Sequence, residues 1–424
     1  MSIALIIIFL VLVFFGTPLA VSLGIASVAT LAIFTDIPLS LIIQSMFSSM
    51  NSFLMVAVPL FILAGILMDE GKVAEKIFNF ANSLVGWSHG GLGNVTVLSS
   101  IIFAGMSGSS VADVASVGKI SINAMRKNGY PTEYATSLAL ITSMLATIIP
   151  PSILMVIAGS VANISIGQAL VAGIVPGLLV AGVFMSYNYY YCRKNHIGTK
   201  VEFSLKNLAK QFTIAIPALM VPIILLGGML SGYFTPTEAA GIAVLYTFIV
   251  SLFIYKSINY RQLPNILFRT AKITGTILFI AVTAKPAGWI FEFDGLPVHV
   301  ATAIGNLTNS PLLIMLILYV FLVLVGMFMD ATAAIYILVP ILLPTVIAVG
   351  IDPIFFIVFM VITLAFGLVT PPVGVCLYAA CNITGLKLET LIKHSMPWIL
   401  ITAVTLLIFI IFPGIVTVPI GWFF

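Results

Sequence analysis

Long apolar segments separated by short polar stretches recur from one end of the chain to the other. They lie near residues 3–16, 18–35, 53–68, 92–105, 109–125, 132–165, 168–190, 212–232, 236–254, 273–291, 311–328, 332–349, 354–383 and 396–418. Many approach the length of about 20 residues that a helix needs to cross a bilayer. The pattern therefore predicts an all-α polytopic membrane protein.

Two pairs of these segments are too short for each pair to form two ordinary crossings. They are 92–105 with 109–125, and 311–328 with 332–349. Both pairs are interrupted at the middle by Gly, Ser, Asp or Thr, and we predict re-entrant helical hairpins over 91–128 and 311–350. The longer segments 132–165 and 354–383 each contain a double proline at the centre. Because proline removes a backbone donor and clashes with the preceding turn, both are predicted to be broken transmembrane helices. Non-helical backbone at membrane depth persists only where protein or a water-filled cavity satisfies it.

The hairpin and the broken helix occur twice, at the same spacing. Three landmarks recur 221 residues later along the chain: Gly105-Met106 at Gly326-Met327, Gly129 at Gly350, and Pro150-Pro151 at Pro371-Pro372. Five crossings separate the two copies, and an odd number inverts the second copy relative to the first. Inverted repeats whose broken helices meet near the bilayer midplane are typical of secondary transporters.

Composition excludes several other classes of protein. Hydrophobic residues make up 61% of the 424 residues and charged residues only 7%, against roughly 25% charged residues in soluble domains. The mean hydropathy is +1.23. The sequence contains no ATP-binding loop, no catalytic dyad and no His or Cys pattern with metal-ligand spacing. We therefore expect no enzyme activity, no cofactor and no nucleic-acid partner.

The charged residues divide the predicted loops into two groups. Apart from Lys119 and Lys285, every cation falls on one side: Lys72, Lys76, Arg126, Lys127, Arg193, Lys194, Lys200, Lys206, Lys210, Lys256, Arg261, Arg269, Lys272, Lys387 and Lys393. The loops on the opposite side carry acids and no cation. By the positive-inside rule, the basic side is cytoplasmic and both termini are periplasmic.

Short polar residues gather at the hairpin turns and beside the proline pairs. Carbonyl and hydroxyl oxygens in such places suit a small hard cation, while helix N-termini attract an anionic group. An alternative role for the serines and threonines is close helix packing. The candidate substrate-binding residues are Ser107, Ser109, Ser110, Ser152, Asp330 and Thr332.

Several charged residues fall within or beside apolar segments. Asp330 is placed near the bilayer centre, where an acid is costly and functional by default; it balances a cation, orients the turn or caps a helix. Asp113 and Lys119 belong either to structural charge pairs or to the site. Glu238 is either an ordinary helix start or a further site residue. Lys285 either snorkels to the interface or meets an acid.

The strings that carry these residues resemble the large membrane subunit, DctM type, of TRAP (tripartite ATP-independent periplasmic) transporters, from end to end. They are Ala104-Gly105-Met106-Ser107-Gly108-Ser109-Ser110, Pro150-Pro151-Ser152, Phe234-Thr235-Pro236-Thr237-Glu238-Ala239-Ala240, Gly326-Met327-Phe328-Met329-Asp330, Gly350-Ile351-Asp352-Pro353 and Thr370-Pro371-Pro372-Val373-Gly374. The second turn has Met329-Asp330 where the first has Gly108-Ser109, so the two halves cannot serve identical roles.

The resemblance implies a bacterial inner-membrane protein with a fold like that of the ion transporter superfamily. It implies two partners, a four-helix small membrane subunit and a soluble periplasmic substrate-binding protein. It also implies sodium-coupled uptake of an acidic solute by an elevator movement. By the same likeness, sodium is expected at Ser107, Gly108, Pro150, Gly326, Met327, Asp330, Thr370, Pro371 and Gly374. Family solutes include C4-dicarboxylates, other organic acids and sialic acid, and the sequence looks closest to the sialic-acid branch.

On this interpretation the chain has six parts. They are scaffold helices at 1–68, an amphipathic cytoplasmic arm at 69–90, a first transport-domain repeat at 91–190, a cytoplasmic loop and scaffold helices at 191–294, an amphipathic periplasmic arm at 295–310 and a second transport-domain repeat at 311–424. We expect the two arms to lie along the membrane interface and to link a moving unit to a fixed one.

Three alternatives belong to other classes of function. An ion channel also uses re-entrant loops, but an inverted repeat of broken helices favours alternating access. A membrane-embedded hydrolase needs a nucleophile and a base that this sequence does not offer. A proton-coupled transporter is the third alternative, with Asp330, Asp113 or Glu133 as the titrating group.

Overall fold

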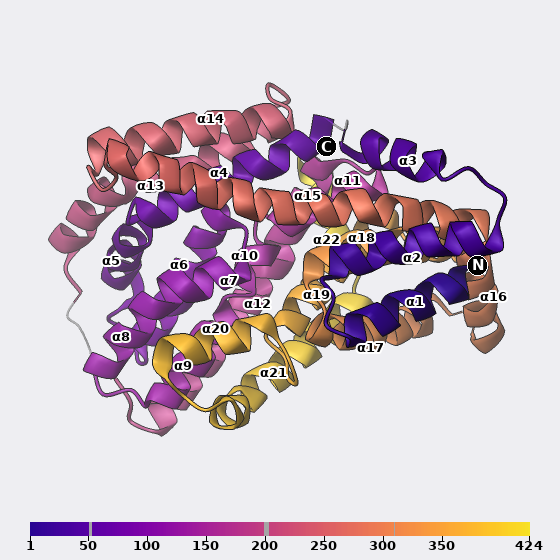
Figure 1. Cartoon of the computed structure of the whole chain (residues 1–424). Coiled ribbons are helices and arrows are strands. Elements are labelled where there is room, and N and C mark those ends of the chain that lie inside the picture. Colours follow the sequence, from indigo (N-terminus) through magenta and orange to yellow (C-terminus); the bar gives the residue numbers. More distant parts are fainter. Residues whose placement is uncertain (51–52, 199–202, 309) are drawn as a thin grey trace.

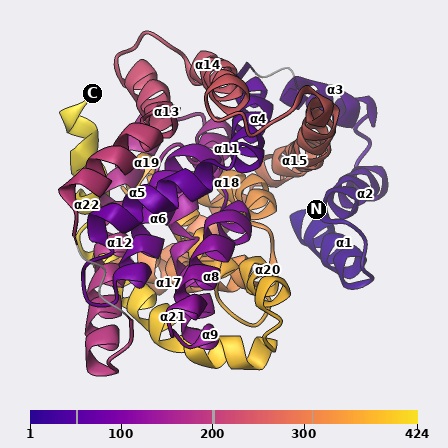
Figure 2. The same ribbon diagram turned by 90° about the vertical axis from the view of Figure 1, so that its left-hand side faces the viewer.

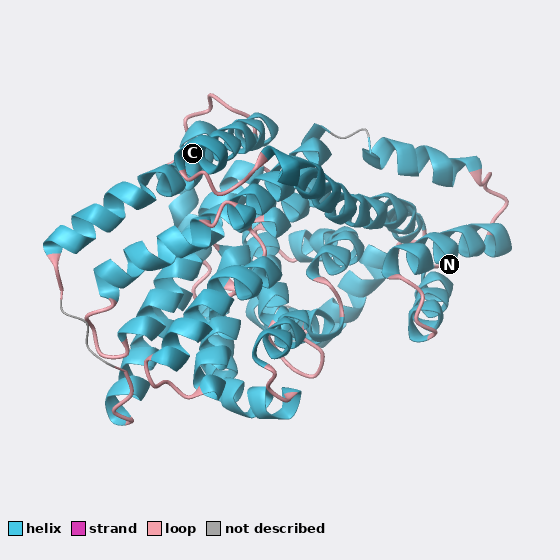
Figure 3. Cartoon of the chain, turned by 60° about the vertical axis from the view of Figure 1, so that its left-hand side comes forward, coloured by secondary structure: helices cyan, strands magenta, loops and turns pink. Residues whose placement is uncertain are grey.

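A computed structural model describes residues 1–50, 53–198, 203–308 and 310–424, and in these ranges the chain folds into helices without any strand (Figure 3). Lys200, assigned above to the basic side, lies outside the described residues. In chain order the helices are α1 (Ser2–Phe14), α2 (Leu19–Phe34), α3 (Ser40–Met50), η1 (Phe53–Val56), α4 (Ala57–Glu70), α5 (Val73–Val85), α6 (Gly91–Ser107), α7 (Ser110–Asp113), η2 (Val114–Gly118), α8 (Lys119–Lys127), α9 (Thr132–Thr142), α10 (Leu145–Ile148), α11 (Ile153–Ala162), α12 (Ile166–Lys194), α13 (Leu205–Leu230), α14 (Pro236–Ile249), η3 (Val250–Ile254), η4 (Tyr260–Gln262), α15 (Leu263–Phe293), α16 (Leu296–Leu307), α17 (Pro311–Phe328), α18 (Ala331–Ala348), α19 (Pro353–Leu368), α20 (Val375–Thr384), α21 (Leu388–Ile411), α22 (Gly414–Thr417) and η5 (Val418–Trp422).

Length and apolar composition make many of these helices suitable for a bilayer. Seven of the described helices are long and apolar enough to cross a membrane, and an eighth span results if the bent pair formed by α9–α10 and α11 is counted as one. Shorter apolar helices, among them α1, α2, α6 and α19, accompany them. The predicted all-α polytopic class is confirmed.

Both predicted hairpins are present, and their turns lie inside the molecule. In the first, α6 ends at Ser107, Gly108 takes a left-handed φ of +58°, and the chain returns through α7, η2 and α8. In the second, α17 and α18 are joined by Met329 and Asp330 alone. Ser107 and Thr332, which flank the two turns, are buried. A turn between two ordinary crossings would lie in water, so the burial agrees with re-entrant hairpins.

Both broken helices are present as well. The chain bends by 41° between Thr132–Ile148 and Ile153–Ala162, and the first proline pair lies in the break. In the second copy, α19 ends at Leu368 and α20 begins at Val375, with the second pair in the break. Both proline pairs contain a cis peptide bond.

The turn that follows each hairpin repeats in detail. Tyr130 donates its backbone N–H to the Met125 carbonyl at 3.1 Å, and Ile351 donates to Val346 at 3.0 Å. Gly129 and Gly350, which precede the two donors, have φ values of +81° and +80°. Only glycine adopts such angles without a steric cost, which explains why this landmark recurs 221 residues apart. The internal repeat is confirmed by backbone geometry.

The two copies pack against one another reciprocally. Helix α11, from the first broken helix, lies along α18, the returning arm of the second hairpin (Figure 2). In the same way, α20 from the second broken helix packs on α7 and η2, the returning arm of the first hairpin. Each half therefore completes the other, as in an inverted repeat.

Other helices pack beside this double repeat. Figure 1 shows α15 running across the molecule, with α2 and α4 alongside it, and α15 also packs on α18. The amphipathic helices expected in the two arms are α5, which packs on α6 and α13, and α16, which packs on α18. The pattern did not predict α3, a short and mostly exposed helix that packs on α15.

Candidate functional site

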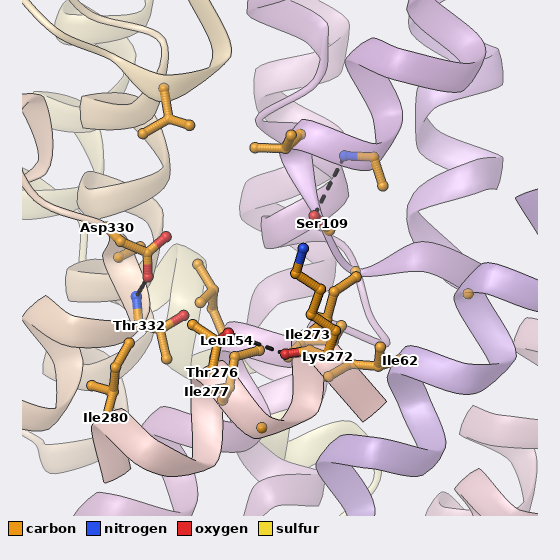
Figure 4. Close-up of a pocket in the computed structure, with 18 of the residues that line it drawn as sticks. Ile62, Ser109, Leu154, Lys272, Ile273, Thr276, Ile277, Ile280, Asp330 and Thr332 are labelled. Carbon is orange, nitrogen blue, oxygen red and sulfur yellow. Dashed lines mark hydrogen bonds between the residues drawn. The ribbon is translucent and has the colours of Figure 1, made fainter. Parts of the chain in front are cut away.

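Both hairpin turns open into one cavity of about 980 Å³. Its walls come from the first turn with α10 and α11, from the second turn with the ends of α19 and α20, and from α2, α4 and α15. Figure 4 shows Ser109 on one side of this space and Asp330 with Thr332 on the other, with the α15 side chains between them. The structure thus brings together the two turns that lie 221 residues apart in the sequence.

The first turn is held against the first helix break by close backbone contact. A Cβ atom added to Gly108 would lie 2.8 Å from both the Pro151 carbonyl oxygen and the Ile153 nitrogen. Beside it, Ser107 is only 5% exposed, and its Oγ has no hydrogen-bond partner among the described residues. A buried hydroxyl without a partner is unusual. Ser107 also lines the cavity.

The other serines of this turn have protein partners. Ser109 Oγ accepts a hydrogen bond from the Ala112 N–H at 3.4 Å and thereby caps α7. Ser110 Oγ lies 3.3 Å from Thr147 Oγ1 on α10. Thr147 also lines the cavity, and the sequence analysis did not single it out. It stands three residues before the first proline pair, and this position could have indicated it.

The second turn places an acid at a helix N-terminus. Asp330 caps α18, and its Oδ1 accepts a hydrogen bond from the Thr332 N–H at 2.9 Å. The predicted capping role of Asp330 is therefore confirmed. The same carboxylate lines the cavity, so the cap and a role in the site are compatible.

The second turn is also held against its own broken helix. The Gly374 N–H donates to the Met327 carbonyl at 3.1 Å. A Cβ atom on Gly374 would lie 2.7 Å from the Thr370 carbonyl oxygen and 3.0 Å from that of Leu368. Backbone oxygens thus face the glycine at this break, an arrangement that suits a hard cation.

Several other candidate residues are not part of the described cavity lining. Ser152 is buried; its hydroxyl is bonded at 2.6 Å to the Thr147 carbonyl and accepts from the Met155 N–H at 3.2 Å. Thr370 Oγ1 donates to the Phe366 carbonyl at 2.6 Å. The described lining of the cavity does not include the candidates Ser152, Pro150, Gly326, Met327, Thr370, Pro371 and Gly374.

The two remaining candidates, Glu238 and Asp113, lie apart from the cavity. Glu238 and Thr235 form a capping box at the start of α14, with Glu238 Oε2 accepting from the Thr235 N–H at 2.8 Å. This is the ordinary helix start considered for that string. Asp113 is 0% exposed; Ser100 donates to its Oδ2 at 2.9 Å, and its Oδ1 has no partner among the described residues. Lys119 is exposed.

One wall of the cavity was missed by the sequence analysis. Arg269, Lys272, Thr276 and Ile280 of α15 line it. The sequence placed both cations on the basic surface, because they precede the apolar core of this segment. Helix α15 begins at Leu263, however, so Lys272 lies more than two turns inside the helix. In the sequence, a cation near the start of an apolar segment looks the same whether it lies on the surface or in a cavity wall.

Two inverted copies of a hairpin and a broken helix, meeting at a shared cavity, define a secondary transporter. The chain belongs to the tripartite ATP-independent periplasmic (TRAP) transporters as their DctM component, since that family model matches residues 6–415. The protein is therefore a multi-pass membrane permease and not an enzyme.

Relatives with known names extend over nearly the whole chain. The large permease protein SiaM of the sialic acid TRAP transporter of Vibrio cholerae is 34% identical, over 95% of this chain and 94% of SiaM. The isethionate TRAP transporter permease protein DctMQ of Oleidesulfovibrio alaskensis is 37% identical over 94% of this chain, which spans only 63% of that longer protein. Among solved structures, the Alcanivorax borkumensis YdaH transporter matches 91% of this chain and 88% of its own with a TM-score of 0.60 at 15% identity. It shares the fold.

Proposed function

We propose that this chain is the large transmembrane subunit of a sodium-coupled importer of an acidic solute. It works with a small four-helix membrane subunit, and a periplasmic binding protein delivers the solute. The observation that carries the proposal is the single cavity lined by both hairpin turns. A solute in this cavity touches both repeats at once, so its binding is linked to the arrangement of both turns.

Sodium is the proposed coupling ion, and no cofactor is involved. The first ion site is supported by the unpartnered Oγ of Ser107, next to the close contact between Gly108 and the Pro151 carbonyl. The second is supported by the Leu368 and Thr370 carbonyls that face Gly374. Asp330 supplies negative charge at the second turn. Hard oxygen ligands of this kind fit Na⁺.

The proposed movement is an elevator, in which the hairpins and broken helices slide past a scaffold that contains α2, α4 and α15. Support comes from the cavity, which lies between these two groups of helices. Its lining extends to Asp69 and Arg269, on the side where basic residues are concentrated. If that side is cytoplasmic and both termini are periplasmic, the structure represents the inward-facing state.

The proposed solute is sialic acid (N-acetylneuraminate), a bulky sugar acid. A cavity of about 980 Å³ is at the upper end of the range of about 300–1,000 Å³ for small-molecule sites. That size fits a sugar acid better than a small sulfonate such as isethionate. C4-dicarboxylates and other organic acids are the next solutes to test.

The test is uptake into proteoliposomes that contain both membrane subunits, with binding proteins charged with known acids added outside. Uptake should require an inward sodium gradient, the matching binding protein and an acid. Uptake that is unchanged when potassium replaces sodium would contradict sodium coupling. Uptake that follows a pH gradient alone would favour the proton-coupled alternative, and single-channel currents would favour a channel.

A further inference from the structure

The α15 wall of the cavity carries two cations one helical turn apart. Arg269 and Lys272 both line the cavity, followed on the same face by Thr276 and Ile280. Lys272 lies nine positions after Leu263, where α15 begins, which is roughly 14 Å along the helix axis. Lys272 is therefore a residue of the helical cavity wall and not of a loop.

The two cations differ in their partners. Arg269 Nη1 lies 3.2 Å from Glu70 Oε1 and 3.8 Å from Asp69 Oδ2, so acids of α4 balance its charge. Lys272 takes part in no ion pair within the described ranges. Figure 4 shows its ammonium group directed into the cavity, toward Ser109 of the first hairpin turn.

An ammonium group without an acidic partner in a mostly apolar cavity attracts a carboxylate, because charge-assisted hydrogen bonds are stronger than neutral ones. Asp330 lies on the other side of the same cavity, next to Thr332 (Figure 4). A bound acid is thus attracted at Lys272 and repelled at Asp330. The two charges therefore orient the bound solute, with its acidic group at α15.

We propose that Lys272 binds the carboxylate of the transported acid and so selects acids over neutral solutes of the same size. This inference rests on the proposed function of the cavity. Helix α15 belongs to the proposed scaffold and the hairpin turns to the moving unit. The contact between Lys272 and the solute therefore forms only when the turns lie opposite Lys272. Lys272 is then a specificity residue of this state of the transporter.

The experiment compares an acid with its own methyl ester, which has nearly the same shape and no charge. Equilibrium binding of N-acetylneuraminate and of its methyl ester is measured in sodium chloride on the purified complex of both membrane subunits. The wild-type complex should bind the acid more tightly. In K272Q the affinity for the acid should fall on the order of tenfold, while affinity for the ester stays unchanged. K272R should retain the preference.

Lys285 provides the matched control, since it is an exposed lysine of the same helix outside the cavity lining. K285Q should keep the wild-type preference for the acid. A K272Q complex that still prefers the acid by the wild-type ratio would overturn the inference. Failure of the proposed function looks different, because the wild-type protein would then show no sodium-driven uptake of any acid in the panel. If another acid is taken up, that acid and its ester replace the first pair.

Discussion

The Gly374 N–H donates a hydrogen bond of 3.1 Å to the Met327 carbonyl, and this bond joins the second hairpin turn to the break in its own helix. The two residues are separated by the whole of α18 and α19. One backbone N–H of the break is thus satisfied by the neighbouring turn, as irregular backbone within a membrane requires. The hairpin and the broken helix of this repeat act as one unit.

The first prediction concerns the packing of this unit. In G367A, the new methyl group would lie 2.5 Å from Gly326 Cα and carbonyl carbon, so α17 must move away from α19. We expect a loss of roughly 1–3 kcal/mol of stability, measured as a lower thermal unfolding midpoint in detergent. G182A is the control, because a Cβ there meets no atom within 4 Å; an equal loss in G182A would contradict the packing argument.

The second prediction tests the unpartnered hydroxyl of the first turn. S107A should raise the sodium concentration required for half-maximal uptake, because the proposed ion loses one oxygen ligand, and folding should be unaffected. Ser99 of the same helix is also buried with an unpartnered Oγ, but it is outside the cavity lining. S99A should leave the sodium dependence as it is. Equal sodium curves for S107A and the wild type would remove Ser107 from the ion site.

The third prediction separates the two roles of Asp330. Asparagine caps helices about as well as aspartate, so D330N should keep its stability and lose sodium affinity. D330A loses the cap as well and should be less stable by about 1 kcal/mol. Uptake measured against sodium concentration at several pH values is the readout. A D330N variant with normal sodium dependence and an altered pH dependence would instead support proton coupling.

The fourth prediction concerns the buried acid in the returning arm of the first hairpin. Ser100 donates to Asp113 Oδ2 at 2.9 Å, and S100A leaves that buried oxygen without its donor. We expect a loss of about 1–3 kcal/mol, read as a lower unfolding midpoint. Ser121 is the comparison, since its buried Oγ has no partner among the described residues. S121A should therefore be nearly neutral, and equal effects of the two substitutions would contradict a supporting role for Ser100.

Much of the fold could be predicted from sequence because its main features are properties of the backbone. A double proline breaks a helix wherever it stands, and Gly129 and Gly350 mark turns whose positive φ only glycine adopts readily. These local constraints repeat at a fixed spacing, so the two copies were visible without any tertiary information. Helix α3 was missed, because Ser40–Met50 is short and contains four serines.

The site was less predictable, because its walls depend on how distant helices are rotated. The turn residues Ser107 and Asp330 were found from their local patterns, and both line the cavity. Which face α15 turns toward the cavity follows from its packing on α2, α4 and α18, and no local pattern encodes that packing. Ser152 is not part of the described lining and caps α11, so a polar residue beside a break need not face the cavity.

The crossed packing of α11 on α18 and of α20 on α7 and η2 has a consequence for how the two halves diverge. A substitution that enlarges a side chain at one of these contacts crowds a helix of the other copy. The compensating substitution then has to occur in that other copy. The duplicated halves have become different in sequence, as Ser109 and Asp330 show, yet neither is free to change alone. Substitutions at these contacts are therefore expected to occur in pairs, one in each half.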